Sequence, residues 1–231
     1  MPFTLQRDEQ DFLIFHGAFS ALSLVVLLIP IALDVGPRLA LLVLLYNISL
    51  VAMIHIRDHV EWLRIWVFVA MVSVLQVLPD WFLSSVLGIL VFPNDGFPKI
   101  GSVSGYMVGL WVIPLFIIVY ASITVERRMI RAYLPHLIAA LVALVIFGLS
   151  EETMWILPSW HAQNVFMVDH MALYILVPEM ILGITTYHLY KQSLSTDWFT
   201  KVLYAFWVMI TYLGAASLFY LLVEGVLLGA I

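Results

Sequence analysis

The hydrophobic and polar positions of this chain fall into long blocks, in which apolar runs alternate with short polar segments. A helix needs about 20 apolar residues to cross the hydrocarbon core of a bilayer. Seven blocks come close to or exceed this length, at positions 12–33, 39–56, 62–92, 106–124, 133–150, 166–190 and 202–228. The pattern therefore predicts an all-α, polytopic integral membrane protein, in which residues 1–231 form a single bundle of seven transmembrane helices.

The block at 62–92 is longer than one crossing needs, and Pro79-Asp80 interrupts it. If it crosses once, eight of the ten Lys and Arg residues share one side, and only Arg38 and Lys99 lie opposite. If it crosses twice, the split is six to four. Cytoplasmic loops are enriched in Lys and Arg. The charge pattern therefore favours seven helices, with the N-terminus in the cytoplasm and the C-terminus outside.

Composition agrees with a membrane protein. Hydrophobic residues make up 64% and charged residues 11% of the chain, against roughly 45–50% and about 25% in soluble domains. The absence of cysteine excludes disulfides and thiolate metal sites. A net charge of −5 argues against a nucleic-acid partner. Because the first residues are rich in acids, we expect the first apolar run to be retained as a helix rather than removed as a signal peptide.

On this map the outer end of the bundle is acidic, with almost no Lys or Arg to neutralise it. The candidate catalytic residues there are Asp80, Glu151, Glu152, Asp169, His170 and Glu224. Asp169 and His170 are expected in the first turn of the helix at 166–190. Crowded carboxylates favour a neutral form of one member, which can serve as a general acid. The alternative interpretation is that these are ordinary helix-end charges at the lipid headgroups.

Glu179 is separate from this group, because it lies near the middle of the helix at 166–190, directly after Pro178. A carboxylate at that depth must face the bundle interior or be protonated. The proline also leaves the carbonyl of Tyr174, one turn earlier, without a helical donor. Glu179 is therefore a further catalytic candidate, although a structural hydrogen bond would also account for it.

The aromatic residues provide candidate substrate contacts. Those chosen lie beside the acids or deeper in the predicted helices, namely Trp66, Trp81, Trp155, Tyr174, Trp207 and Tyr220. Aromatic faces can stabilise a carbocation through cation–π attraction. Other tryptophans near helix ends, including Trp111 and Trp160, fit an interfacial aromatic belt. Simple packing is the alternative interpretation for all of them.

The inner end is rich in histidine. His55 and His59 have the i, i+4 spacing with which two imidazoles can bind one metal ion, and imidazoles on different helices can hold a haem. Histidines are also common at membrane interfaces. No cofactor is expected, and the His55/His59 metal site is kept as an alternative.

The segment 149–155, Leu-Ser-Glu-Glu-Thr-Met-Trp, followed by Pro158, resembles the acid-plus-aromatic motif of membrane lycopene cyclases. Those enzymes and the seven-helix terpene cyclases are small, cofactor-free bundles that use carboxylic acids as proton donors. The resemblance implies that Glu151 or Glu152 is the acid. It covers about ten residues, and this chain has Leu-Ser where the motif has a proline before the acids.

The sequence therefore predicts an intramembrane enzyme, cyclase- or isomerase-like, that acts on a lipid-soluble isoprenoid, terpenoid or carotenoid substrate. A proton-coupled transporter or channel is one alternative, with Glu179 and Glu224 as relay groups. A pigment- or haem-binding membrane subunit is another. A retinal protein is disfavoured because the last helix has no internal Lys. Zinc hydrolases of the ceramidase type are disfavoured because that helix has no His.

Overall fold

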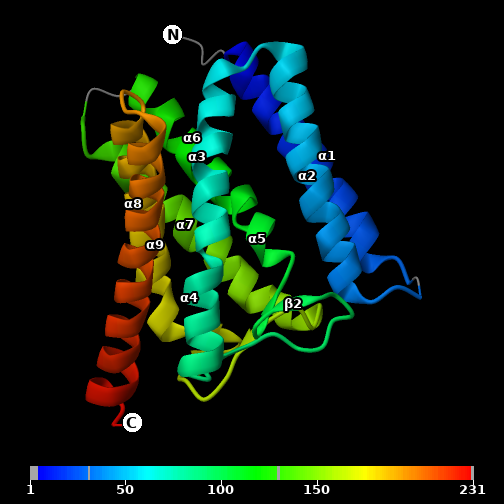
Figure 1. Ribbon diagram of the computed structural model, residues 1–231, viewed down its shortest axis with the longest axis vertical. Helices are drawn as coiled ribbons and strands as arrows, with labels where there is room; N and C mark the ends of the chain where they lie inside the picture. The colour runs from blue at the N-terminus through cyan, green and yellow to red at the C-terminus, as the bar shows by residue number, and fades with distance from the viewer. Residues whose placement is uncertain (1–4, 31, 129–130, 230–231) are drawn as a thin grey trace.

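The computed structural model describes residues 5–30, 32–128 and 131–229 and is a bundle of long helices (Figure 1). The described residues begin at one end of the bundle, the upper end in Figure 1, and the last long helix finishes at the opposite, lower end. The long helices are α1 (Arg7–Leu28), α2 (Val35–Arg57), α3 (Val60–Leu75), α6 (Val112–Arg128), α7 (Leu134–Thr153), α8 (Leu176–Ser193) and α9 (Trp198–Tyr220). The all-α prediction is confirmed.

Shorter elements extend or connect these helices. α3 continues through α4 (Val77–Trp81) into the π-helix η1 (Phe82–Val86), α5 (Met107–Leu110) precedes α6, and α9 continues into the π-helix η4 (Leu221–Leu227). Two 3₁₀ turns, η2 (Met154–Ile156) and η3 (Leu173–Ile175), flank the connection between α7 and α8. The path from Val60 to Val86 runs in one direction (Figure 1), so Pro79 distorts the helix but does not reverse it.

Three two-stranded antiparallel pairs form at the lower end. β1 (Leu90–Val91) pairs with β4 (His161–Ala162), β2 (Lys99–Ile100) with β3 (Val103–Ser104), and β5 (Met167–Val168) with β6 (Met171–Ala172). The prediction of a helix from position 166 is wrong over its first residues. Residues 167–172 form a hairpin there, and Asp169 occupies its turn with φ 53°, a left-handed conformation that Asp tolerates better than most residues.

Six helical segments in the described residues are long and apolar enough to cross a bilayer; they are Arg7–Leu28, Val35–Arg57, Val60–Val86, Met107–Arg128, Leu134–Ile156 and Trp198–Leu227. Large apolar side chains on them point outward, such as Ile14 (67% exposed), Leu28 (70%) and Val226 (74%). Such surfaces are costly in water and favourable in lipid. The protein is therefore a multi-pass helical membrane protein.

α8 is the most polar of the long helices, and it packs tightly between α7 and α9. A Cβ added at Gly183 would lie 2.7 Å from the carbonyl oxygen of Ala139 and 2.7 Å from the Cβ of Ala143. Close backbone approach through small residues is how membrane helices gain packing energy when lipid offers no hydrophobic contrast. The glycine thus sets the α7–α8 distance.

Gly183→Ala is expected to force α7 and α8 apart and to cost about 1–3 kcal/mol. Gly214→Ala is the matched control on α9, because a Cβ there meets no described atom within 4 Å; removing this helical glycine is expected to stabilise by about 0.5–1 kcal/mol. Thermal unfolding in detergent measures both. Equal midpoints for the two variants would contradict the close packing.

Asp197 caps the N-terminus of α9 outside the membrane-spanning segment. The pKa of its carboxyl lies below the ordinary value because the Thr200 hydroxyl (2.7 Å) and the Thr200 backbone N–H (3.1 Å) donate to the ionised form. A carboxyl whose pKa is lowered by folding stabilises the protein above its unfolded pKa of about 3.9. That contribution is lost as the pH falls through the lower folded pKa.

Asp197→Ala is therefore expected to lower the thermal unfolding midpoint near neutral pH. The deficit relative to the wild type should shrink as the pH falls below the unfolded pKa and disappear below the folded one. Parallel melts of the two proteins across this pH range give the difference directly. A deficit that stays constant into acid would show that the ionised cap is not its cause.

Candidate functional site

A cavity of about 490 Å³ lies in the lower half of the bundle. Its volume is within the roughly 300–1,000 Å³ of small-molecule sites. The α1–α2 pair and α6 contribute mainly apolar residues, such as Leu24, Leu42 and Ile117. The rest of the lining carries all three carboxyls and the Trp and Tyr residues, namely Asp80, Trp111, Glu151, Trp160, Tyr174, Glu179 and Tyr212, together with Ser150. None of the described residues that line the cavity is Lys, Arg or His.

Asp80 reaches the cavity from α4, where it follows Pro79. Its side chain is almost fully buried, and its Oδ2 accepts a hydrogen bond from the indole Nε1 of Trp111 at 3.0 Å. Proline lacks the N–H that would bond to the carbonyl one turn earlier, and the helix becomes a π-helix directly after Trp81. π-helical segments are rare and are frequent at functional sites. The distortion thus lies where the carboxyl enters the cavity.

Glu151 lies in the last turn of α7 and lines the cavity beside Ser150. The indole Nε1 of Trp160 donates to its Oε1 at 3.3 Å. Both cavity carboxyls with a hydrogen-bond donor therefore use a tryptophan N–H, a donor that carries no charge.

Glu152, its neighbour in the sequence, is turned about 100° around the helix and lies outside the cavity lining. Its Oε2 accepts from the backbone N–H of His170 at 3.3 Å, and the His170 imidazole stacks on Trp155 with ring centroids 4.0 Å apart. The structure therefore separates the paired acids: one faces the cavity and the other supports the β5–β6 hairpin. Asp169 and His170 belong to this hairpin, not to the first turn of a helix as expected.

Glu179 enters the cavity from the first turn of α8, after Pro178, and not from near the middle of a helix as expected, because α8 begins only at Leu176. The residue is 3% exposed, and its Oε2 has no hydrogen-bond partner within the described part of the chain. Tyr174 and Tyr212 line the same wall. A buried polar atom without a partner costs free energy unless something fills the space beside it. The unpaired Oε2 of Glu179 is thus the polar atom of the cavity wall that is available to contact a ligand.

The other sequence candidates lie elsewhere. Glu224, in η4, is 3% exposed and its Oε1 accepts from the backbone N–H of Phe166 at 2.8 Å, which ties the last helix to the β5–β6 segment. Tyr220 stacks edge-on against Tyr174 at 5.7 Å. Neither Glu224 nor Tyr220 lines the cavity.

All four tryptophan candidates, Trp66, Trp81, Trp155 and Trp207, also fall outside the cavity lining. Trp66 donates from Nε1 to Asn47 Oδ1 at 3.0 Å and links α3 to α2. Trp81 is 43% exposed. Trp207 lies well inside the span of α9, away from the helix ends as expected, and is 56% exposed on the outer surface of that helix.

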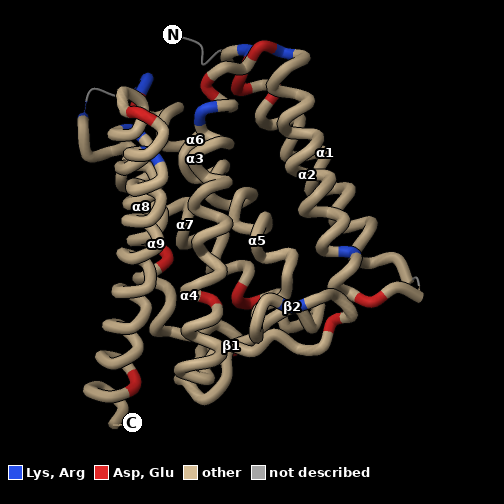
Figure 2. Tube along the Cα trace, viewed as in Figure 1, with Lys and Arg blue, Asp and Glu red and all other residues tan. Residues whose placement is uncertain are grey.

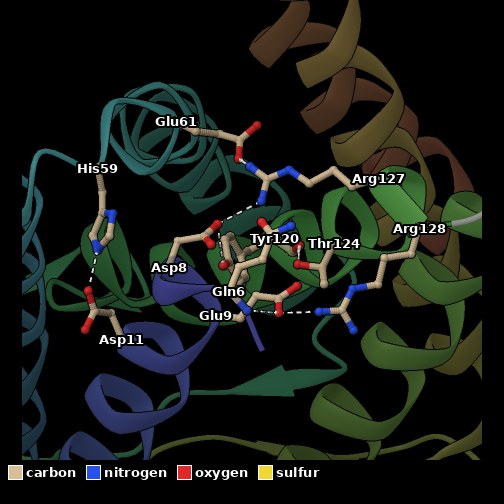
Figure 3. Close-up of polar contacts among 10 residues, drawn as sticks. All are labelled: Gln6, Asp8, Glu9, Asp11, His59, Glu61, Tyr120, Thr124, Arg127 and Arg128. Carbon is tan, nitrogen blue, oxygen red and sulfur yellow. Dashed lines mark hydrogen bonds and ion pairs between the residues drawn. The ribbon is translucent and has the colours of Figure 1, made fainter. Parts of the chain in front are cut away.

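At the upper end, the acidic first turns of α1 are held by a network that we call the N-terminal clasp (Figure 3). Asp8 accepts from Arg127 at 2.8 Å and from the Tyr120 hydroxyl at 3.0 Å, and Asp11 accepts from Arg57 and His59, both at 2.9 Å. Ion pairs also join Glu9 to Arg128 and Glu61 to Arg127. Below the clasp, Phe12 stacks on Tyr120 at 4.3 Å. The clasp therefore joins α1 to α2, α3 and α6.

His55 and His59 are not placed as the i, i+4 metal pair that the sequence offers as an alternative. α2 ends at Arg57 and Asp58 is left-handed, so His59 points to Asp11, whereas the Nδ1 of His55 lies 2.8 Å from the carbonyl of Val51 on its own helix. The described residues contain no group of three or more His, Asp or Glu side chains placed to hold a metal ion. Of the other inner histidines, His136 and His188 contact each other at 3.3 Å.

Sequence reasoning missed three cavity residues. The sequence pattern predicts Trp111 and Trp160 at the membrane interface, because each lies near the end of an apolar run, and it contains no signal for Tyr212. Pairing an indole with a particular carboxyl depends on contacts across 31 residues for Trp111 and Asp80, which no local pattern contains. Tyr174, by contrast, was a candidate because of Pro178.

The fold and the cavity define a polytopic helical membrane protein with an internal, acid-lined apolar site. Residues 77–223 match the family described as a domain of unknown function, DUF6989, and the chain belongs to this family. The matched segment contains all three cavity carboxyls, whereas α1 and α2 precede it. No curated protein and no solved structure matches the chain.

Proposed function

We propose that this protein is an intramembrane enzyme, cyclase- or isomerase-like, that uses carboxylic-acid catalysis on a lipid-soluble, isoprenoid-like substrate. The observation that carries the proposal is one apolar cavity that collects Asp80, Glu151 and Glu179. Convergent polar groups in an otherwise apolar pocket are the usual signature of a ligand site. Since the described lining contains no Lys, Arg or His, these carboxyls are the groups that would donate and accept protons in the reaction.

The contacts of the carboxyls support different roles for them. Glu179 has an oxygen with no donor, so its neutral acid form fits the role of proton donor. Asp80 and Glu151 each accept an indole N–H, which suits an ionised form. In the proposed reaction Glu179 donates its proton to an alkene carbon, the π electrons form the new C–H bond, and a carbocation results. Asp80 or Glu151 then removes a proton from a neighbouring carbon, which restores a double bond.

The aromatic residues of the same wall support this chemistry. Trp111, Trp160, Tyr174 and Tyr212 line the cavity together with the carboxyls, and the faces of such rings attract a cation within about 6 Å. Apolar walls also exclude water, which would otherwise capture the intermediate. The net reaction moves a double bond, or closes a ring where the π electrons of a second double bond attack the carbocation before the proton is removed. Return of that proton to Glu179 restores the acid, so no cofactor is consumed.

Proton-coupled transport is the second candidate, because an unpaired buried carboxyl such as Glu179 is also what a proton relay uses. The two candidates differ in what they need. A transporter requires proton flux across vesicles with its substrate, whereas the enzyme changes its substrate chemically in a closed membrane or in detergent.

Glu179→Gln is expected to remove the proton donor while preserving volume. General acid catalysis contributes roughly 10²–10⁴-fold, so product formation should fall by about that factor. The measurement is chromatography and mass spectrometry of lipids from a host that makes linear isoprenoids such as lycopene, with the wild type or the variant expressed to equal levels. Proton flux without a new product would contradict the enzyme and favour transport.

Glu151 and Glu152 offer a matched pair for the same assay. Glu151→Gln removes a cavity carboxyl and is expected to lower product formation strongly, whereas Glu152→Gln changes only a carboxyl at the hairpin and should retain activity. Glu224→Gln is the control for Glu179, because it neutralises a carboxyl that is equally buried but outside the cavity lining. Loss of activity in the two controls, with full activity in the cavity variants, would overturn the assignment.

We also propose that the chain crosses the cell membrane seven times, with its N-terminus in the cytoplasm. Figure 2 supports this orientation, because Lys and Arg gather at the upper end. Eight of the ten lie there, with only Arg38 and Lys99 at the lower end. α8 is the most polar of the seven proposed membrane-spanning helices. It packs between α7 and α9, and these neighbours shield it from lipid.

Reporter fusions are expected to agree with this orientation. Alkaline phosphatase fused after the last residue should be active, since the C-terminus is outside, and the same enzyme fused within residues 194–197, between α8 and α9, should be inactive. A fluorescent protein that matures only in the cytoplasm should give the opposite pattern. Equal activity at the two positions would mean that α9 does not cross the membrane.

A further inference from the structure

The apolar wall of the cavity is also part of the outer surface of the protein. Leu24 of α1 lines the cavity and is nevertheless 61% exposed. Ser20, one turn earlier, is likewise exposed and lines the cavity. In a membrane-spanning helix these exposed faces meet lipid. The cavity is therefore continuous with the lipid-facing surface along the lower half of α1.

The attachment of α1 explains why this opening lies in its lower half. The N-terminal clasp and the Phe12–Tyr120 stack hold the upper half against α6 (Figure 3). At its lower end, Arg38 of α2 donates to the carbonyls of Leu27 (3.3 Å) and Ile29 (3.0 Å). In Figure 1 the lower part of the α1–α2 pair is splayed away from the other helices. Between these attachments, residues 19–27 of α1 border the cavity.

The two walls of the cavity differ in polarity, so a ligand with one reactive end and one apolar end would bind in one orientation. The carboxyls lie on α4, α7 and α8, and the wall formed by α1 and α2 is lined by aliphatic and aromatic side chains and two serines, Ser20 and Ser23. The unpaired Oε2 of Glu179 marks the deep side. A volume of 490 Å³ holds about 16 groups the size of a water molecule, at about 30 Å³ each. One short isoprenoid chain, or one end of a long one, fits this space.

We infer that a single isoprenoid chain enters from the bilayer past residues 19–27 of α1. Its reacting end then lies against Asp80, Glu151 and Glu179, and its apolar remainder lies along α1 and α2. The identity of the ligand rests on the proposed function, whereas the route rests on the exposed cavity wall. The lower half of α1 is thus the substrate portal.

Because the chain has no cysteine, single thiols report on this portal without background. Ser23→Cys places a thiol in the portal, and Ser49→Cys is its matched control on α2. Both hydroxyls donate to the carbonyl four residues earlier, to Phe19 at 2.9 Å and to Leu45 at 2.6 Å, but only Ser23 lines the cavity. The variants are reconstituted in phosphatidylcholine vesicles and labelled with an apolar, membrane-soluble maleimide.

Both thiols are expected to react from the lipid phase. Geranylgeraniol, used as the isoprenoid probe at about ten times its dissociation constant, should slow the labelling of Ser23→Cys about tenfold, because the rate follows the unoccupied fraction. The labelling of Ser49→Cys should be unchanged. Equal labelling of Ser23→Cys with and without the probe would overturn the inference, as would faster labelling by a charged, water-soluble maleimide, which indicates a water-filled path.

A second measurement tests the route itself. Ser150→Cys places a thiol on the deep, carboxyl-bearing wall. Leu24→Trp, which adds bulk at the portal, is expected to slow its labelling by the apolar maleimide several-fold. Leu22→Trp is the control, because Leu22 is 43% exposed on the same helix but does not line the cavity. Unchanged, rapid labelling in the Leu24→Trp protein would show that ligands enter elsewhere.

These outcomes are separate from the test of catalysis, since labelling needs no turnover. If the probe protects Ser23→Cys and the wild type forms no product from isoprenoids, the portal stands and the enzyme assignment falls. If product forms without protection or portal dependence, the enzyme assignment stands and the portal falls.

Discussion

The clasp at the upper end is the interaction on which the cavity depends. Asp8 and Asp11 of α1 meet Arg127 and Arg57, which belong to α6 and α2. These ion pairs fix the first turns of a helix whose remaining surface is largely exposed to lipid. Since apolar side chains gain little by leaving lipid for a neighbouring helix, α1 has few other reasons to stay beside α6. The clasp therefore keeps in place the helix that forms the outer wall of the cavity.

The lower half of the bundle, which contains the cavity, differs from the clasp because the cavity carboxyls are not paired with basic side chains of the described residues. Most Lys and Arg residues gather at the upper end (Figure 2), and the described lining of the cavity in the lower half contains no basic residue beside its carboxyls. Asp80 and Glu151 are satisfied by indole N–H groups, which donate a hydrogen bond without neutralising the site. Glu179 is left with a free oxygen. A cavity with acids, aromatic faces and no fixed cation suits a substrate that becomes positively charged during reaction. The family match over residues 77–223 covers this acid-bearing half.

The sequence predicted the helices well because their length and apolar content are imposed by the bilayer and are local properties. It failed at 166–172, where an apolar stretch forms a hairpin with Asp169 in its turn. Periodicity does not distinguish a helix from a short strand pair in such a stretch. The apolar pattern also predicts too late a start for the first helix, at position 12 whereas α1 begins at Arg7, because the acidic residues before the apolar run are held by partners on other helices that no local pattern contains.

For the site, the sequence could mark Asp80, Glu151 and Glu179 as unusual, but it could not tell Glu151 from Glu152 or predict that Trp111 meets Asp80. Both depend on how the helices are arranged around the bundle. The central claim is that the cavity holds an isoprenoid chain with one end at the carboxyls. The most direct measurement is an electron cryomicroscopy structure in lipid nanodiscs loaded with geranylgeraniol. The account predicts an elongated density that runs from the lower half of α1 to Glu179. A water-filled path along the bundle axis, with no such density, would contradict it.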